Sequence, residues 1–371
     1  MRVFTCQACG QLLYFENVRC ERCGHLLGYL PDWATMSAIE PLPNDRWSTL
    51  GANSQQYRFC KNNEFGICNW MVPADSEEIF CAACRHNKTI PDLSLPENAQ
   101  RWRKLEAAKR RLFYTLLRLR LPLVNRVDDP VHALAFDFLA QAPNAHGQRI
   151  MTGHDNGVIT LAVKEADDAE REKIRMQMGE PYRTLLGHFR HESGHYFWDV
   201  LVRDGGRLKS FRALFGDEQQ DYAAALSSYY AADQPLDWRQ NFVSAYASSH
   251  PWEDFSETWA HYLHIVDALE TAQSFGVSVQ ARPWRMTEQK AAFDFDPHEA
   301  GDIDQLISAW LPLSFAVNSL NRSMGQPDFY PFLLSPVAIS KLGYVHALIH
   351  GQQPSDQLEP TLHLQTVTVS V

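Results

Sequence analysis

The segment 187–199, GHFRHESGHYFWD, contains two histidines four residues apart with a glutamate between them. On a helix, His191 and His195 lie on one face, so both imidazoles can bind one metal ion. Glu192 stands beside them, where a carboxylate can act on a metal-bound water. Gly194 costs a helix about 1 kcal/mol relative to Ala, and its small size would let another element approach the metal closely. Because so short a pattern also arises by chance, its context decides its meaning.

The context is a predicted helix over 180–202, followed by a second predicted helix in 244–266, which begins near Pro251. Glu253 and Glu257 are four residues apart on the second helix and therefore share a face. One of these carboxylates can bind the metal ion while the other holds the outer N–H of a histidine ligand. The spacing leaves open which carboxylate has which role.

One further histidine, His188, precedes the first histidine of the pair by three residues. It can face the same site, but we expect it to pack or to form a hydrogen bond one turn away.

Eight cysteines lie in the first 84 residues: Cys6, Cys9, Cys20, Cys23, Cys60, Cys68, Cys81 and Cys84. The first four form two Cys-x-x-Cys knuckles, which predict a four-cysteine zinc site of the zinc-ribbon kind. The last four predict a second such site, with His86 as an alternative ligand and a crossed arrangement of the two sets left open. Four thiolates leave no open coordination position, so we expect both zinc ions to be structural.

The rest of the chain predicts an α+β fold, with a cysteine-rich region over 1–92 and a basic linking helix over 93–125. Strands are expected at 132–140 and 156–163, and a free edge of the second strand could pair with a substrate backbone. The pattern is then mainly helical, which gives a domain over 126–350 with a small β-sheet. A polar, β-prone tail follows at 351–371.

The two helical motifs, HESGH and EDFSE, resemble the gluzincin class of zinc peptidases, and in particular lethal-factor-like proteins. This resemblance implies a zincin-like domain with Glu253 as the third zinc ligand and Glu257 as the carboxylate behind a ligand. It also implies Tyr246 as the phenol that stabilises the oxyanion. Four other tyrosines compete for this role: Tyr222, Tyr229, Tyr230 and Tyr262.

Longer stretches, among them CQACG, RWRKLEAAKRRL and HPWEDFSETWAHYLHI, resemble a bacterial family of zinc-binding metallopeptidases with an N-terminal zinc ribbon. The resemblance extends over essentially the whole chain. It implies a zinc-dependent peptidase with Glu192 as general base, one catalytic and two structural zinc ions, and a peptide or protein substrate. The alternative is a recognition or adaptor protein that binds protein or nucleic acid through its ribbons and keeps a non-hydrolytic zincin scaffold.

Composition bears on partners and location. The formal net charge of −10 disfavours a nucleic-acid partner without removing it. No apolar run reaches the roughly 18 residues of a membrane span, and the first residues lack the layout of a secretion signal. We therefore expect a cytoplasmic protein that does not enter a membrane.

Overall fold

The computed structural model describes residues 1–51, 55–140, 153–178, 184–231, 237–281, 289–291 and 294–354. The chain divides into two compact units, Met1–Glu192 and Ser193–Val371. The division falls inside helix α3 (Leu185–Trp198), which is continuous across it. The predicted tail is described only as far as residue 354.

The cysteine-rich region of the first unit is built from short antiparallel strands. A hairpin of β1 (Phe4–Thr5) and β2 (Leu12–Leu13) is followed by a five-stranded sheet in which each strand pairs with the next. The strands of this sheet are β3 (Leu26–Leu30), β4 (Thr35–Leu42), β5 (Arg46–Thr49), β6 (Tyr57–Phe59) and β7 (Met71–Pro73). A small cluster of Leu30, Ile39, Tyr57 and Met71 forms its core.

A second sheet of the first unit has the order β10-β11-β9-β8. Its strands are β8 (Asn87–Thr89), β9 (Ala135–Leu139), β10 (Gly153–Asp155) and β11 (Val158–Ala162). The two strands predicted from the sequence are present as β9 and β11, and they pair in parallel. However, the short strand β10 precedes β11 in a hairpin and pairs with Val158, Ile159 and Thr160. This part of β11 is therefore not a free edge for a substrate.

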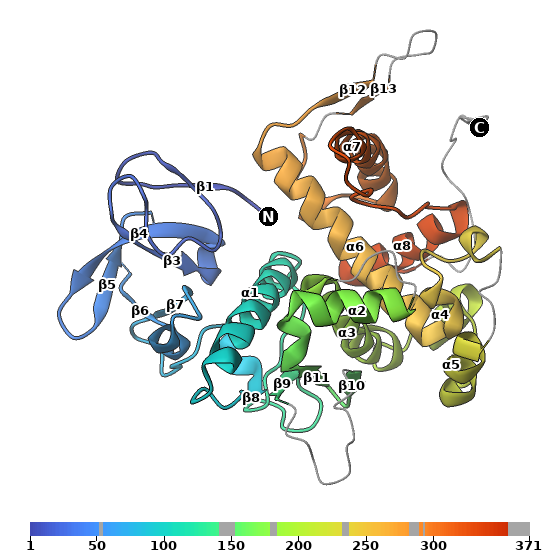
Figure 1. Ribbon diagram of the computed structural model, residues 1–371, viewed down its shortest axis with the longest axis horizontal. Helices are drawn as coiled ribbons and strands as arrows, with labels where there is room; N and C mark the ends of the chain where they lie inside the picture. Colours follow the sequence, from blue (N-terminus) through green and yellow to red (C-terminus); the bar gives the residue numbers. More distant parts are fainter. Residues whose placement is uncertain are drawn as a thin grey trace. The chain divides into compact units, whose positions relative to one another are not determined.

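Helix α1 (Pro96–Arg118) is the predicted basic helix, and it lies beside strands β8 and β9 (Figure 1). Two of its cations are buried. Lys109 pairs with Glu106 at 2.8 Å and also donates to Asn87, and Arg110 donates to the backbone carbonyl of Ile67. These bonds join the helix to the cysteine-rich region because Ile67 lies between two of the cysteines.

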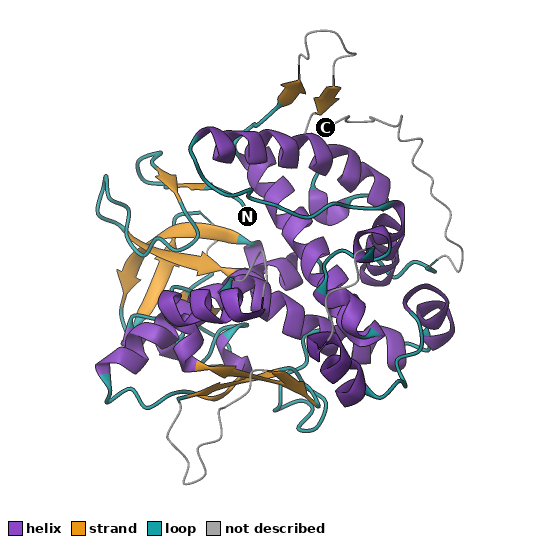
Figure 2. Ribbon diagram, turned by 45° about the vertical axis from the view of Figure 1, so that its right-hand side comes forward, coloured by secondary structure: helices purple, strands orange, loops and turns teal. Residues whose placement is uncertain are grey.

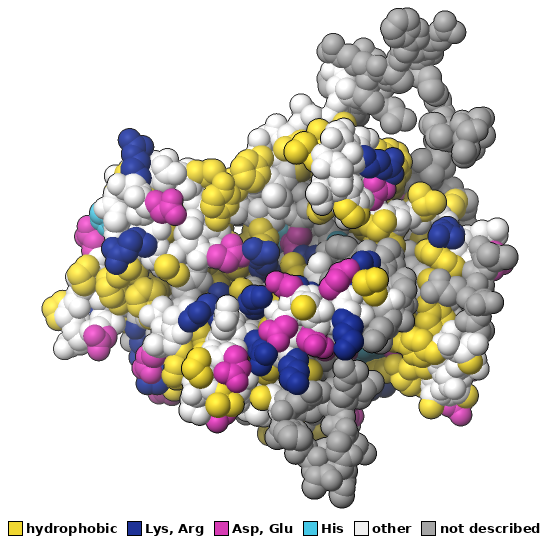
Figure 3. All heavy atoms as spheres, in the orientation of Figure 1, with side chains coloured by type: hydrophobic (Ala, Val, Ile, Leu, Met, Phe, Trp, Pro, Cys, Tyr) yellow, Lys and Arg dark blue, Asp and Glu magenta, His cyan; other side chains and the backbone are white. Residues whose placement is uncertain are grey.

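Three of the more exposed cations of α1 have acidic partners in the same unit. The pairs are Arg101 with Asp167 at 2.8 Å, Lys104 with Asp168 at 3.4 Å and Arg111 with Glu16 at 2.5 Å. On the face that shows α1 and α2 (Asp168–Met178), basic and acidic side chains are interspersed (Figure 3). Acidic side chains of the same unit therefore neutralise part of the positive charge of this helix.

The second unit is built mainly from helices, whereas the larger sheets belong to the first unit (Figure 2). Its helices are the second half of α3, then α4 (Leu208–Phe215), α5 (Tyr222–Ala231), α6 (Pro251–Ser274), α7 (Ile303–Ser323) and α8 (Pro336–Ile349). A hairpin of β12 (Val279–Ala281) and β13 (Gln289–Ala291) follows α6. The predicted α+β class is confirmed, with a zinc-ribbon region followed by a mainly helical part.

Helix α6 is the centre of the second unit and contacts α4, α7 and α8. Buried residues occur all around it, as expected of a helix enclosed on every side. It begins where the sequence predicts. Pro251 occupies the first turn, and the His250 ring accepts a hydrogen bond from the backbone N–H of Trp252 at 3.1 Å. No helix in the described ranges combines the length and apolar character needed to cross a membrane.

Candidate active site

Helices α3 and α6 supply the side chains of a candidate metal centre. The helical repeat of α3 places His191 one turn before His195. Glu253 lies in the first turn of α6, where the helix dipole stabilises a carboxylate. One potential ligand atom from each of these three residues lies within 4.8 Å of the others. The structure therefore brings the predicted histidine pair together with Glu253.

The spacing of these atoms fits a zinc ion. The Nε2 atom of His195 is 3.6 Å from Oε1 of Glu253. Two ligands bound to zinc at about 2.1 Å with a tetrahedral angle are about 3.4 Å apart. Both side chains are almost fully buried, at 5% and 1% exposure, while His191 is half-buried. A buried carboxylate beside two imidazoles is the donor set of catalytic zinc sites that keep one position for water.

Close contact between the two helices fixes the ring of His195. A Cβ atom added to Gly194 would lie 2.8 Å from the Cα atom of Ser256 on α6, so only glycine fits there. The Ser256 hydroxyl lies 2.8 Å from Nδ1 of His195, which leaves Nε2 directed at the carboxylate. The element that the small size of Gly194 lets approach is α6. The sequence pattern did not indicate Ser256 as the partner of His195.

Glu257 lies outside the candidate metal group. Its Oε2 atom accepts a hydrogen bond of 2.6 Å from the Ser244 hydroxyl. The same hydroxyl accepts from the backbone N–H of Ala247 in the short helix Tyr246–Ser249. Through Ser244, Glu257 helps to hold the turn that carries Tyr246.

Glu192 is buried at 5% exposure and faces another histidine on its own helix. Its Oε1 atom is 3.6 Å from Nε2 of His188, one turn earlier. The Nδ1 atom of His188 is in turn 2.7 Å from Oε2 of Glu165, in the turn after β11. As expected, His188 forms a hydrogen bond away from the metal group. The sequence did not indicate its partner Glu165, because 23 residues separate the two.

Two tyrosines lie near Glu253. The Tyr222 hydroxyl donates to Oε1 of Glu253 at 2.6 Å. Burial raises the pKa of Tyr246 far above its ordinary value, and the negative charge of Glu253 adds to this effect. Tyr246 therefore keeps its proton and remains a hydrogen-bond donor. By contrast, Tyr262 contacts His346 on α8 at 3.0 Å, so this hydroxyl is engaged elsewhere.

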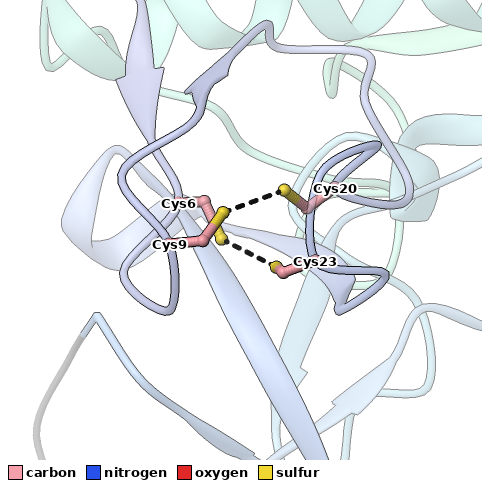
Figure 4. Close-up of side chains that lie close together, drawn as sticks. All are labelled: Cys6, Cys9, Cys20 and Cys23. Carbon is pink, nitrogen blue, oxygen red and sulfur yellow. Dashed lines mark hydrogen bonds between the residues drawn. The ribbon is translucent and has the colours of Figure 1, made fainter.

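The first four cysteines converge as two facing knuckles (Figure 4). The sulfur atoms of Cys6 and Cys23, and those of Cys9 and Cys20, are 3.6 Å apart. Four thiolates bound to zinc at about 2.3 Å would be about 3.8 Å apart. None of the eight cysteines is in a disulfide. The geometry therefore suits a tetrahedral zinc ion.

The last four cysteines form a separate buried group, so the two sets are not crossed. The sulfur atoms of Cys68 and Cys81 are 3.7 Å apart. His86 is not part of this group: its Nδ1 atom contacts the carbonyl of Leu134 at 2.8 Å. Burial lowers the pKa of His86 to about 3, which keeps the ring neutral. Burial alone would lower the pKa of Arg110, but the negative charge of the nearby Cys68 thiolate opposes this effect, and the pKa is raised.

Comparison with known proteins agrees with this arrangement. Residues 98–348 match the family described as "Putative zinc-binding metallo-peptidase", and residues 3–95 match a zinc-ribbon domain. The chain is 39% identical over 368 residues to proteins of Mycobacterium bovis and of two strains of Mycobacterium tuberculosis. The match covers 99% of this chain and 100% of each relative, and all three are described as uncharacterized proteins. No solved structure matches the chain. The chain therefore belongs to this family of zinc-binding metallopeptidases with an N-terminal zinc ribbon.

Proposed function

We propose that the chain is a gluzincin-type peptidase whose catalytic zinc ion is held by His191, His195 and Glu253. The observation that carries the proposal is the convergence of these three side chains from two helices, with Glu192 beside them on α3. The family described as zinc-binding metallo-peptidases supports peptide hydrolysis as the reaction. Two further zinc ions in the cysteine groups would be structural.

A zinc ion held by these residues supplies a Lewis acid that polarises a peptide carbonyl and brings the pKa of water toward about 7. The chain's own residues then handle the protons. Glu192 takes the proton of the attacking water on its carboxylate and delivers it to the leaving amine. The carboxylate of Glu192 is buried, and its contact with His188 restrains one of its two oxygens. Glu165 fixes the His188 ring from the other side.

Tyr246 is the residue that we propose for oxyanion stabilisation. Its phenol keeps its proton, and it lies on a turn that Glu257 and Ser244 hold in place. Tyr222 is less suited to this role because its hydroxyl already donates a hydrogen bond to Glu253. A phenol that donates to the developing negative charge contributes most when it is fixed before the reaction.

The test of the proposal is Glu192→Gln, assayed on a fluorescence-quenched peptide library and on denatured casein. We expect the variant to bind as much zinc as the wild type and to lose turnover by about 10²- to 10⁴-fold, the usual contribution of a general base. The control is Glu172→Gln, on the exposed face of α2, where the carboxylate pairs only with its neighbour Arg175 among the contacts described. Equal cleavage by Glu192→Gln and the wild type would contradict the mechanism.

The alternative of a recognition protein with an inert zincin scaffold makes a different prediction. Wild type and Glu192→Gln would then be equally inactive on every peptide, while binding a partner through the ribbon region. The buried contacts that hold Glu192 beside the metal group favour a working base.

A further inference from the structure

A fourth group of metal-ligating side chains lies in the second unit, apart from the candidate active site. Asp267 and Glu270 are three residues apart on α6 and share one face of this helix. His298 comes from the short helix Pro297–Glu299, which packs against α6. One potential ligand atom of each residue lies within 4.8 Å of the others. Asp267 follows Glu253 by 14 residues, which is about 21 Å along a helix, so the two groups are separate sites.

All three side chains are buried, with exposures of 6% for Asp267, 0% for Glu270 and 2% for His298. Buried charged groups are costly unless opposite charge lies beside them. A divalent cation bound among these three side chains would place positive charge next to both carboxylates.

The orientation of the His298 ring points to the same conclusion. Its Nδ1 atom is 3.3 Å from Oδ1 of Asp296, which also accepts from the backbone N–H of His298, and 3.6 Å from Oε1 of Glu270. Its Nε2 atom is 4.0 Å from Oδ1 of Asp267. Metal-binding histidines commonly have an outer carboxylate on one nitrogen, which fixes the tautomer and directs the other nitrogen at the ion. Asp296 has the position of that outer carboxylate.

We propose that Asp267, Glu270 and His298 bind a divalent metal ion with a structural role. The distance between Nε2 of His298 and Oδ1 of Asp267 is 4.0 Å, whereas two ligands at about 2.1 Å with a tetrahedral angle are about 3.4 Å apart, so the two side chains would move together by about 0.6 Å on binding the ion. One imidazole and two carboxylates suit Zn²⁺ or Mn²⁺, whereas Ca²⁺ and Mg²⁺ prefer oxygen ligands alone. The ion would fasten the Pro297–Glu299 turn, and the start of α7 after it, onto α6.

The first experiment counts metal ions in the full chain by elemental analysis, after purification with Zn²⁺ and, separately, Mn²⁺ in the buffers. The four groups predict four ions per wild-type chain and three per chain of the His298→Asn variant. The control variant is His261→Asn, a buried histidine of α6 whose ring contacts the Tyr330 hydroxyl at 2.6 Å and which, among the described residues, belongs to none of the four groups. It should retain the wild-type number.

This count does not depend on the proposed peptidase centre. If that centre bound no zinc, the wild type would hold three ions and His298→Asn two, so the difference of one would persist. An equal count in wild type and His298→Asn overturns the proposal.

Should His298→Asn fail to fold, anomalous X-ray scattering from wild-type crystals grown with Zn²⁺ or Mn²⁺ decides the question. A peak between the three side chains supports the site, and its absence overturns it.

Discussion

Gly194→Ala tests the closest approach of the candidate active site, that of α3 to α6. The added Cβ atom would lie 2.8 Å from the Cα atom of Ser256, and ordinary contact begins at 3.4 Å. The helices must therefore separate by at least 3.4 − 2.8 = 0.6 Å, because the obstacle is backbone. If this movement adds fully to the 3.6 Å between His195 and Glu253, the ligand atoms stand about 4.2 Å apart, the most that two bonds to zinc can bridge.

The effects on stability and on zinc binding differ in size. Overpacking costs about 1–3 kcal/mol, and replacing glycine by alanine in a helix returns about 1 kcal/mol. The net loss in the free energy of unfolding is then about 0–2 kcal/mol. Zinc affinity should fall by about 10- to 100-fold, as when a group that orients a ligand is lost, because the Ser256 contact with His195 is disturbed as well.

Zinc affinity is measured by competition with a fluorescent chelator in chains whose cysteine groups are already filled, and stability by chemical unfolding. The control is Gly343→Ala in α8, where the new methyl meets only the Ile303 side chain at 3.2 Å. This variant should keep wild-type affinity. Wild-type zinc affinity in Gly194→Ala would refute the reasoning that α6 must approach α3 this closely to assemble the site.

Three further predictions concern single side chains. Lys341→Met should lower the free energy of unfolding by about 3–5 kcal/mol, measured by urea unfolding, since it leaves Asp254 buried without its 2.6 Å partner; an unchanged value would contradict the pairing. Burial lowers the pKa of His346 to about 4, so between about pH 6.5 and 4 the unfolded chain binds a proton that the folded chain does not. Stability should fall over this window by up to about 1.4 kcal/mol per pH unit, and His346→Gln should flatten the slope of unfolding free energy against pH. Tyr246→Phe should reduce kcat by about 10²- to 10³-fold with zinc retained, whereas Tyr229→Phe, whose ring centroid lies 5.9 Å away, should not.

Local signals in the sequence predicted the parts of the site that depend on neighbours along the chain. The start of α6 followed from Pro251, and the shared face of His191 and His195 followed from the helical repeat. The cysteine knuckles were equally readable because each pair forms its own turn. The spacing could not show whether Glu253 or Glu257 lies nearer the histidine pair, since both are on one face of the helix. Their difference depends on how α3 packs against α6.

Contacts between distant segments could not be predicted. Glu165 lies 23 residues from His188, and Tyr222 lies 31 residues from Glu253. No periodicity connects such residues, because tertiary packing alone brings them together. The same holds for strand β10, which is only three residues long and has no apolar alternation to reveal that it covers β11.

The buried cations of α1 bear on whether the cysteine-rich region can be removed from the protein. Lys109 and Arg110 rely on Asn87 and on the carbonyl of Ile67, both supplied by the cysteine-rich region. A chain shortened to begin at residue 93 would leave the buried Arg110 without the Ile67 carbonyl, and Lys109 would keep Glu106 but lose Asn87. Expression of residues 93–371 alone should therefore yield less soluble protein than expression of the whole chain.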